Sequence, residues 1–310
     1  MTRLPDTRPH RFLALATVVL AGSAAISGCA TTSGAVETTP AESAADIGHI
    51  HGLGIDPDTG VIFFAAHGGM FELPNLDADE PIPLTELAGP IAGRAQDTMG
   101  FTMIDGRMFG SGHPGPDEVE TRPANLGLLT STDSAKSWDS VSLSGEVDFH
   151  DIAAARTAAG EFELYGYSAT TGRVMTSRDS GSSWSSGATL AIRDLTIDPD
   201  AGGIVYGTTE GGLMESADAG ATFSPAADAP ALYLVESLQD GTGGLIGVDV
   251  SGTVWVKTTT DGWRETGSAT GLVEAMTYSS TASGTLLVAD DRGISTSEDF
   301  GATWRQLATR

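Results

Sequence analysis

Two histidines stand close together in the segment GHIHGLG, at positions His49 and His51. Alternate residues of a β-strand point to the same face, so a strand here would present both imidazoles together. His67, His113 and His150 follow later in a chain that has only six histidines. Imidazole and carboxylate groups are the ligands expected for Zn²⁺, Cu²⁺, Mn²⁺ or Fe²⁺. These residues can form one site only if the fold gathers them.

The overall charge narrows the classes of partner. The 310 residues include 41 acidic and 16 basic ones, which gives a formal net charge of −25. A nucleic-acid partner is excluded by this balance, because phosphate binding needs a basic face. A strongly acidic surface instead raises the local concentration of cations. The chain has a single cysteine, so no intrachain disulfide can form.

The N-terminal segment has the layout of a secretory signal. Three arginines precede an apolar run over residues 12–25, and the sequence ISGC ends at Cys29. This ending resembles a bacterial lipobox, which implies that residues 1–28 are removed and that Cys29 carries a lipid. The alternative is an ordinary cleaved signal with a chance cysteine. Residues 29–46 are small and polar, which predicts a flexible tether. We therefore expect an extracytoplasmic protein held at the membrane by its N-terminal lipid.

A repeat organises the rest of the chain. Its four copies are STDSAKSW (131–138), SRDSGSSW (177–184), SADAGATF (216–223) and SEDFGATW (297–304). They resemble the Asp-box, or BNR, repeat, and a degenerate copy ends at Trp263. The closing aromatics of the five copies are spaced by 39 to 46 residues. A period of about 40–45 residues with short strands is typical of β-propeller blades.

Residues 47–310 are therefore predicted to form an all-β, six-bladed β-propeller with Asp-box turns, and a seven-bladed propeller is the alternative. The predicted blades are 47–92, 93–143, 144–188, 189–228, 229–268 and 269–310. The box aspartates are interpreted as structural, because such side chains accept hydrogen bonds from turn amides; they are Asp133, Asp179, Asp218 and Asp299. Ala135 replaces the turn glycine of the first copy, which predicts a looser or differently shaped turn. No strand is left over at either end, so packing of blade 1 against blade 6 is expected to close the ring.

Aligning the six units places the histidines on one rim. His49, His51 and His150 fall where inner strands begin, and His67 and His113 fall in the turns between second and third strands. A propeller blade brings these two places to the same rim. Six acidic residues are predicted to form a ring around the channel mouth there: Asp97, Asp148, Asp151, Asp194, Glu236 and Glu274. Met70 is expected in the core, because two other blades have methionine at its position.

The first hypothesis is a metal-binding or metal-dependent site on this rim. Its predicted ligands for Zn²⁺, Cu²⁺ or Mn²⁺ are His49, His51, His150, Asp97 and Asp148, with His67 and His113 at its mouth. The ligand set contains no thiolate, which disfavours Cu(I) and structural zinc.

Two further hypotheses come from the resemblance. Asp-box propellers resemble sialidases, and the chain is similar to bacterial lipoproteins catalogued as glycosylhydrolase-like, which implies an exo-glycosidase. Its candidate catalytic residues are Asp97, Asp148 and Glu236. The chain lacks the segment that carries the first sialidase arginine, although four arginines map near the rim: Arg94, Arg173, Arg193 and Arg292. Resemblance to sortilin-type and photosystem-assembly propellers implies instead a module that binds a protein or peptide.

Overall fold

The computed structural model of the protein describes residues 47–310 apart from 75–79, 199–202, 240, 242 and 281–283. The predicted signal segment, Cys29 and the tether lie outside the described residues. Within them the helices are two short 3₁₀ turns, η1 (Leu84–Glu86) and η2 (Ile91–Gly93). No helix in this part of the chain has the length and apolar character needed to cross a membrane.

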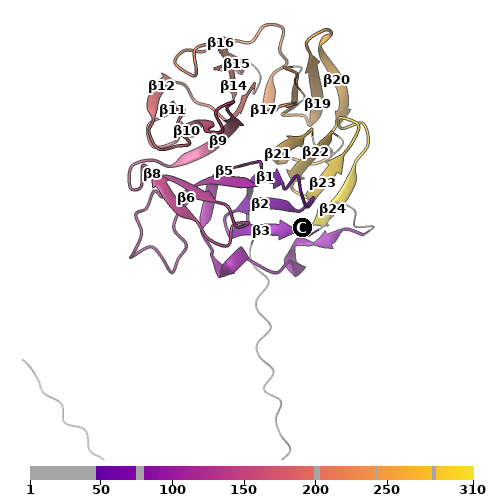
Figure 1. Ribbon diagram of the computed structural model, residues 1–310. Helices are drawn as coiled ribbons and strands as arrows, with labels where there is room; N and C mark the ends of the chain where they lie inside the picture. The colour runs from indigo at the N-terminus through magenta and orange to yellow at the C-terminus, as the bar shows by residue number, and fades with distance from the viewer. Residues whose placement is uncertain (1–46, 75–79, 199–202, 240, 242, 281–283) are drawn as a thin grey trace, which may run out of the picture. The chain divides into compact units, whose positions relative to one another are not determined.

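The described strands form six sheets arranged as the blades of a ring, and consecutive strands within each blade are antiparallel (Figure 1). Blades 1 to 3 contain β1 (Ile50–Ile55), β2 (Ile62–Ala66) and β3 (Gly69–Leu73); β5 (Asp97–Ile104), β6 (Arg107–His113), β7 (Leu128–Ser131) and β8 (Asp139–Ser142); and β9 (Phe149–Arg156), β10 (Phe162–Ser168), β11 (Arg173–Ser177) and β12 (Ser185–Thr189). Blades 4 to 6 contain β13 (Asp194–Ile197), β14 (Val205–Thr209), β15 (Gly212–Ser216) and β16 (Ser224–Pro225); β17 (Leu232–Ser237), β18 (Leu245–Asp249), β19 (Thr253–Thr258) and β20 (Gly262–Ser268); and β21 (Val273–Ser279), β22 (Thr285–Asp290), β23 (Gly293–Ser297) and β24 (Arg305–Thr309). The inner strand of each blade contacts those of its two neighbours, and β21 contacts β1. The predicted six-bladed β-propeller is confirmed.

Burial explains why the strands differ in composition. The second strands are covered on both faces by neighbouring blades, and β2 (IFFAA) and β22 (TLLVAD) are buried along their whole length. Such strands read as continuous apolar runs. The outer strands β12 (SSGAT) and β16 (SP) are polar and mostly exposed. The core of the described residues divides into clusters that each lie between two adjacent blades, and Met70 is buried in the one between blades 1 and 2, as predicted.

The four Ser–Asp segments make the same turn. In each, one carboxylate oxygen of the aspartate accepts a bond of 2.8–2.9 Å from the amide four residues later. The serine hydroxyl two residues before the aspartate donates to the same oxygen. Hydrogen bonds from Ser137, chiefly from its hydroxyl and then from its amide, lower the pKa of the Asp133 carboxyl to about 2. These aspartates therefore hold the four turns through hydrogen bonds.

The prediction of a looser or differently shaped first turn is wrong. Ala135 adopts φ of 61°, close to the left-handed conformation of Gly181 at 87° in the second copy. Its amide donates to Ser131 Oγ at 3.1 Å, as the Gly181 amide does to Ser177 Oγ at 2.9 Å. Alanine can enter this region at a cost of about 1–2 kcal/mol, which the surrounding hydrogen bonds offset.

Ring closure also differs from the prediction. Blade 1 does pack against blade 6, with Ile50 and Phe64 in one cluster with Leu287 and Leu307. However, β4 (Ile82–Pro83), which follows the three strands of blade 1, pairs in parallel with β24 of blade 6. Figure 1 shows the yellow C-terminal strands beside the indigo first blade. Packing alone therefore does not close the ring, because backbone hydrogen bonding extends blade 6 by a strand from the N-terminal side.

The Ser–Asp turns generate a stability prediction. An alanine Cβ at position 181 would lie 2.0 Å from Leu128 Cδ2, and the residue has φ of +87°. Gly181→Ala should lower the free energy of unfolding by about 2–4 kcal/mol, from left-handed strain and overpacking. Gly172→Ala is the matched control, because φ is +65° there but nothing lies within 4 Å; it should cost about 1 kcal/mol. Equal losses in urea unfolding would show that the close contact does not matter.

Candidate functional site

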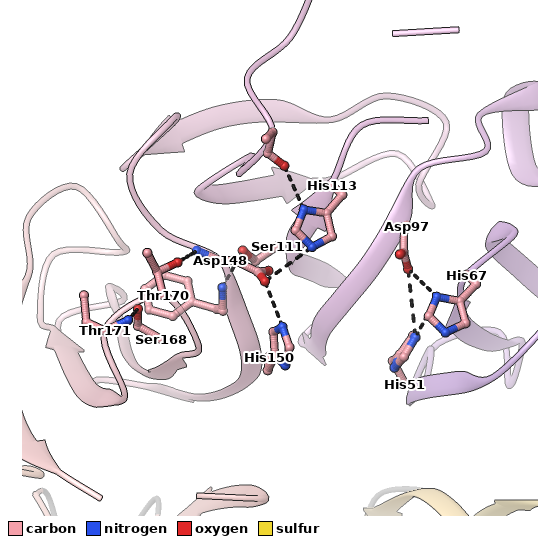
Figure 2. A network of polar contacts seen from close by, with 12 residues as sticks. His51, His67, Asp97, Ser111, His113, Asp148, His150, Ser168, Thr170 and Thr171 are labelled. Atoms are coloured by element: carbon pink, nitrogen blue, oxygen red, sulfur yellow. Dashed lines mark hydrogen bonds and ion pairs between the residues drawn. The ribbon is translucent and has the colours of Figure 1, made fainter. Parts of the chain in front are cut away.

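Four of the five described histidines gather in two clusters on one rim (Figure 2). Cluster A consists of His51, His67 and Asp97. Cluster B consists of His113, Asp148 and His150. In each cluster two imidazoles approach a single carboxylate. The structure thus divides the predicted ligand set between two places and gives His67 and His113, predicted only at the mouth, central positions.

Cluster A is assembled from two blades. His51 is the second residue of β1, His67 lies in the turn between β2 and β3, and Asp97 begins β5 of the next blade. His67 Nδ1 lies 3.0 Å from Asp97 Oδ1 and 3.4 Å from His51 Nε2. The third separation, between His51 Nε2 and Asp97 Oδ1, is 3.9 Å. The His51 side chain is only 11% exposed, whereas that of His67 is 50% exposed, so the cluster opens to solvent on one side.

The spacing within cluster A fits a metal ion. Its three ligand atoms all lie within 4.8 Å of one another, and among the described residues no other group of three meets this condition. Tetrahedral ligands at about 2.0–2.1 Å from Zn²⁺ are separated from one another by about 3.3–3.4 Å. Separations of 3.0, 3.4 and 3.9 Å bracket that value. Two imidazoles and one carboxylate would leave at least one coordination position for water or a ligand.

The protonation state of cluster A favours coordination. Burial lowers the pKa of His51 to about 3, and the neighbouring His67 and His49 act in the same direction. His51 is therefore neutral at physiological pH and has a lone pair available for a metal. His49 extends the cluster, because its ring centroid lies 5.1 Å from that of His51. Burial lowers the pKa of His49 as well, although its side chain reaches solvent.

Cluster B has a buried carboxylate at its centre. Asp148 Oδ2 lies 2.8 Å from His150 Nε2 and 3.4 Å from His113 Nε2, and the Asp148 side chain is 8% exposed. The hydrogen bond to Asp148 raises the pKa of His150. His113 Nδ1 donates to the carbonyl oxygen of Ala124 at 2.8 Å. Because a carbonyl only accepts, this bond places a hydrogen on Nδ1 and turns Nε2 towards Asp148.

Four of the six residues of the predicted acidic ring lie in the channel wall, and three of these join blades. Asp151 accepts from the amide of Leu195, Asp194 from that of Val235, and Glu274 from that of Ile50. Each amide belongs to the inner strand of the next blade. Glu236 contacts Thr196 Oγ1 at 3.4 Å. These carboxylates, with His51, His150 and Arg193, line a central cavity of about 240 Å³.

Burial of the channel carboxylates raises their pKa values, and repulsion between neighbours adds to the shift for two of them. Burial raises the pKa of Asp151 to about 7, even though the amides of Leu195 and Ile152 act against the shift. Burial, and to a lesser extent repulsion from Asp151, raises the pKa of Asp194. Burial also raises the pKa of Glu236, with smaller contributions from Asp194 and Asp151. The channel is thus less negative at neutral pH than its composition suggests.

The four candidate arginines do not form an anion-binding triad. Arg94 pairs with Glu118 at 3.6 Å, and Arg292 pairs with Asp290 at 2.8 Å. Arg173 donates to the carbonyl oxygen of Gly187. Arg193 alone of the four lines the central cavity, where it donates to the carbonyl of Glu274 and lies 4.8 Å from the centre of the Tyr233 ring.

One residue near the site escaped sequence reasoning. Arg310, at the end of the chain, donates through Nη1 to the carbonyl oxygen of Gly48 at 2.7 Å and also bonds to Glu274. It therefore fixes the strand start that carries His49 and His51. A terminal arginine beyond the last repeat has no counterpart in the other blades, so the repeat alignment gave no signal for it.

Comparison with known proteins supports the fold. No protein-family model matches the chain, and no curated protein matches it. Similar solved structures include an ancestral GH74 enzyme, at 14% identity and a TM-score of 0.52 over 85% of this chain and 39% of that one. A GH74 xyloglucanase from Xanthomonas campestris matches at 18% identity and a TM-score of 0.51, over 85% of this chain and 46% of that one.

A third similar structure belongs to a nidogen/laminin complex, at 11% identity and a TM-score of 0.59 over 81% of this chain and 93% of that one. The chain spans less than half the length of either GH74 enzyme. At these identities the likeness establishes the β-propeller fold alone.

The channel carboxylates generate a prediction about pH. The folded-state pKa of Asp151 is raised from 3.8 to about 7, so its contribution to stability is present below pH 3.8 and is lost as the pH rises to about 7. Asp151→Asn keeps an oxygen for the Leu195 amide but cannot ionise. The variant should therefore gain about 2 kcal/mol relative to the wild type between about pH 4 and 7.5, roughly half of the full linkage value because the side chain is partly exposed. Urea unfolding of the variant and the wild type at about pH 4 and pH 7.5 measures this gain. A difference in unfolding free energy that is the same at both pH values would contradict the prediction.

Proposed function

We propose that the chain binds a divalent transition-metal ion at cluster A and presents it to ligands at the mouth of the channel. The observation that carries the proposal is the convergence of three ligand atoms, from His51, His67 and Asp97, within 4.8 Å of one another. The donors are two imidazoles and a carboxylate, a set that suits Zn²⁺, Cu²⁺ or Mn²⁺. Three protein ligands with an open position are the arrangement of catalytic rather than structural zinc sites.

The surroundings support this proposal. The acidic surface of a chain with net charge −25 attracts cations to the rim. His49 lies close enough to His51 to serve as an additional ligand after a ring movement, since their centroids are 5.1 Å apart. The half-exposed His67 gives the ion a path from solvent. The cavity below, lined by His51 and Arg193, offers space for a small ligand on the ion.

Removing one ligand tests the site. Zn²⁺ should raise the melting temperature of chelator-treated, untagged protein by roughly 5 °C or more at about 100 times the dissociation constant, because binding then adds about 2.7 kcal/mol. His67→Gln should weaken the tightest Zn²⁺ site by about 100-fold or more. Glu210→Gln is the control, since this exposed carboxylate occupies the corresponding turn of blade 4. Calorimetric titration measures the affinity. A wild type that does not bind Zn²⁺, and whose melting temperature Zn²⁺ does not raise, would contradict the proposal.

A glycoside hydrolase remains the second candidate. The observation in its favour is Glu236 in the channel cavity, where burial raises its pKa and suits it to act as a general acid. The other two candidate carboxylates, Asp97 and Asp148, are each engaged by two imidazoles. Turnover of neutral aryl glycosides that survives chelation and disappears in Glu236→Gln would favour this candidate over the metal site.

A module that binds a protein or peptide on the same rim would instead retain its partner when His67 is replaced.

We also propose that the chain is exported and anchored through a lipid on Cys29, on the support of the ISGC segment and the apolar run before it. Cys29→Ala should move the protein from the membrane fraction to the soluble extracytoplasmic fraction, because a protein without the acceptor thiol cannot be lipidated there. Immunoblotting of the fractions measures this. Unchanged membrane association of the variant would contradict a lipid anchor at this cysteine.

A further inference from the structure

Cluster B repeats the architecture of cluster A one blade further along. In cluster A, His67 lies in the turn after the second strand of blade 1, and Asp97 begins the inner strand of blade 2. In cluster B, His113 ends the second strand of blade 2, and Asp148 directly precedes the inner strand of blade 3. A second imidazole joins each histidine–aspartate pair from an inner strand, His51 in one case and His150 in the other. The same histidine–aspartate contact therefore crosses two successive blade boundaries.

The two clusters are neighbours. Asp97 and His113 are directly opposed in the register of β5 and β6. Side chains opposed in this way on an antiparallel pair have Cβ atoms about 4.5–5.5 Å apart. The carboxylate of cluster A and an imidazole of cluster B are thus adjacent along one edge of blade 2, and Figure 2 shows the clusters side by side.

One of the two oxygens of the Asp148 carboxylate has no hydrogen-bond partner among the described residues. This oxygen, Oδ1, is buried, and the Asp148 side chain is 8% exposed. Leaving a buried polar atom without a partner is costly, and a metal ion bound by the carboxylate would remove that cost. His113 is prepared for such a role, because its Nδ1 donates to the Ala124 carbonyl. Histidines that bind metals characteristically donate their other nitrogen in this way, which fixes the tautomer.

We propose that cluster B binds a second divalent transition-metal ion, so that the rim carries two adjacent ions. His113 Nε2 and the Asp148 carboxylate are the primary ligands, and His150 Nε2 is the third. The contacts of 3.4 and 2.8 Å to Asp148 Oδ2 resemble the separation of about 2.9–3.4 Å between neighbouring ligands of one such ion. The ligand atoms converge less closely than in cluster A, so the 41% exposed His150 must rotate to close the site. Cluster A therefore fills first, and cluster B binds more weakly.

The proposal goes beyond the proposed function and rests on different residues. Calorimetric titration of untagged, metal-free full chain with Zn²⁺ should give two equivalents for the wild type and for Glu210→Gln. Asp148→Asn and His113→Gln should each remove the weaker equivalent and keep the tight one. His67→Gln should remove the tight one and keep the weaker. Circular dichroism confirms that each variant folds, and the half-exposed His113 provides a variant that leaves the buried Asp148 in place.

The outcomes separate the two claims. One equivalent in the wild type that His67→Gln abolishes would overturn the second site and leave cluster A standing. One equivalent that only the cluster B variants abolish would overturn the proposed function instead. Adjacency has its own readout, because two Cu²⁺ ions should broaden each other's electron paramagnetic resonance signals in the wild type but not in His113→Gln. Identical spectra would overturn the pairing of the ions.

Discussion

The contact between His67 and Asp97 crosses a boundary between blades, and the candidate metal site exists only where that boundary is held in register. Their side chains meet at 3.0 Å although they belong to separate sheets. Carboxylates connect neighbouring inner strands by accepting hydrogen bonds from backbone amides of the next blade. Asp151 accepts one from the Leu195 amide, and Asp194 accepts one from the Val235 amide. The acidic residues of the channel thus chiefly connect the inner strands of the scaffold that carries the candidate site.

Closure of the ring and position of the histidines are linked through blade 6. The Glu274 carboxylate accepts hydrogen bonds from the Ile50 amide and from the Arg310 side chain. Arg310 also donates a hydrogen bond to the carbonyl oxygen of Gly48. These contacts bracket the start of β1, where His49 and His51 lie. The parallel pairing of β4 with β24 fastens the same two blades at their outer edge. The start of β1, which would fray in an isolated sheet, is therefore held in place by these contacts. A metal site needs such support, because its imidazole nitrogens must be placed to within a few tenths of an ångström.

The repeat made the fold predictable, because a period of about 40 residues with a shared turn allows few architectures. The same alignment placed all five histidines after Cys29 on one rim, which the structure bears out for His51, His67, His113 and His150 through their contacts. It could not divide them into clusters, since that depends on which side chain meets which carboxylate across a blade boundary. The bond of Arg310 to Gly48 is a tertiary contact that no repeat position encodes. Ala135 keeps the left-handed turn of its repeat position, although its residue type argued against that conformation.

The central claim is that cluster A is a metal site, and the position of a bound ion tests it most directly. Crystals of the Zn²⁺-loaded protein, measured at the zinc absorption edge, would show the ion as an anomalous peak. The account predicts a peak at about 2.0–2.2 Å from His51 Nε2, His67 Nδ1 and Asp97 Oδ1. Fully loaded crystals with no peak between these three atoms would contradict it.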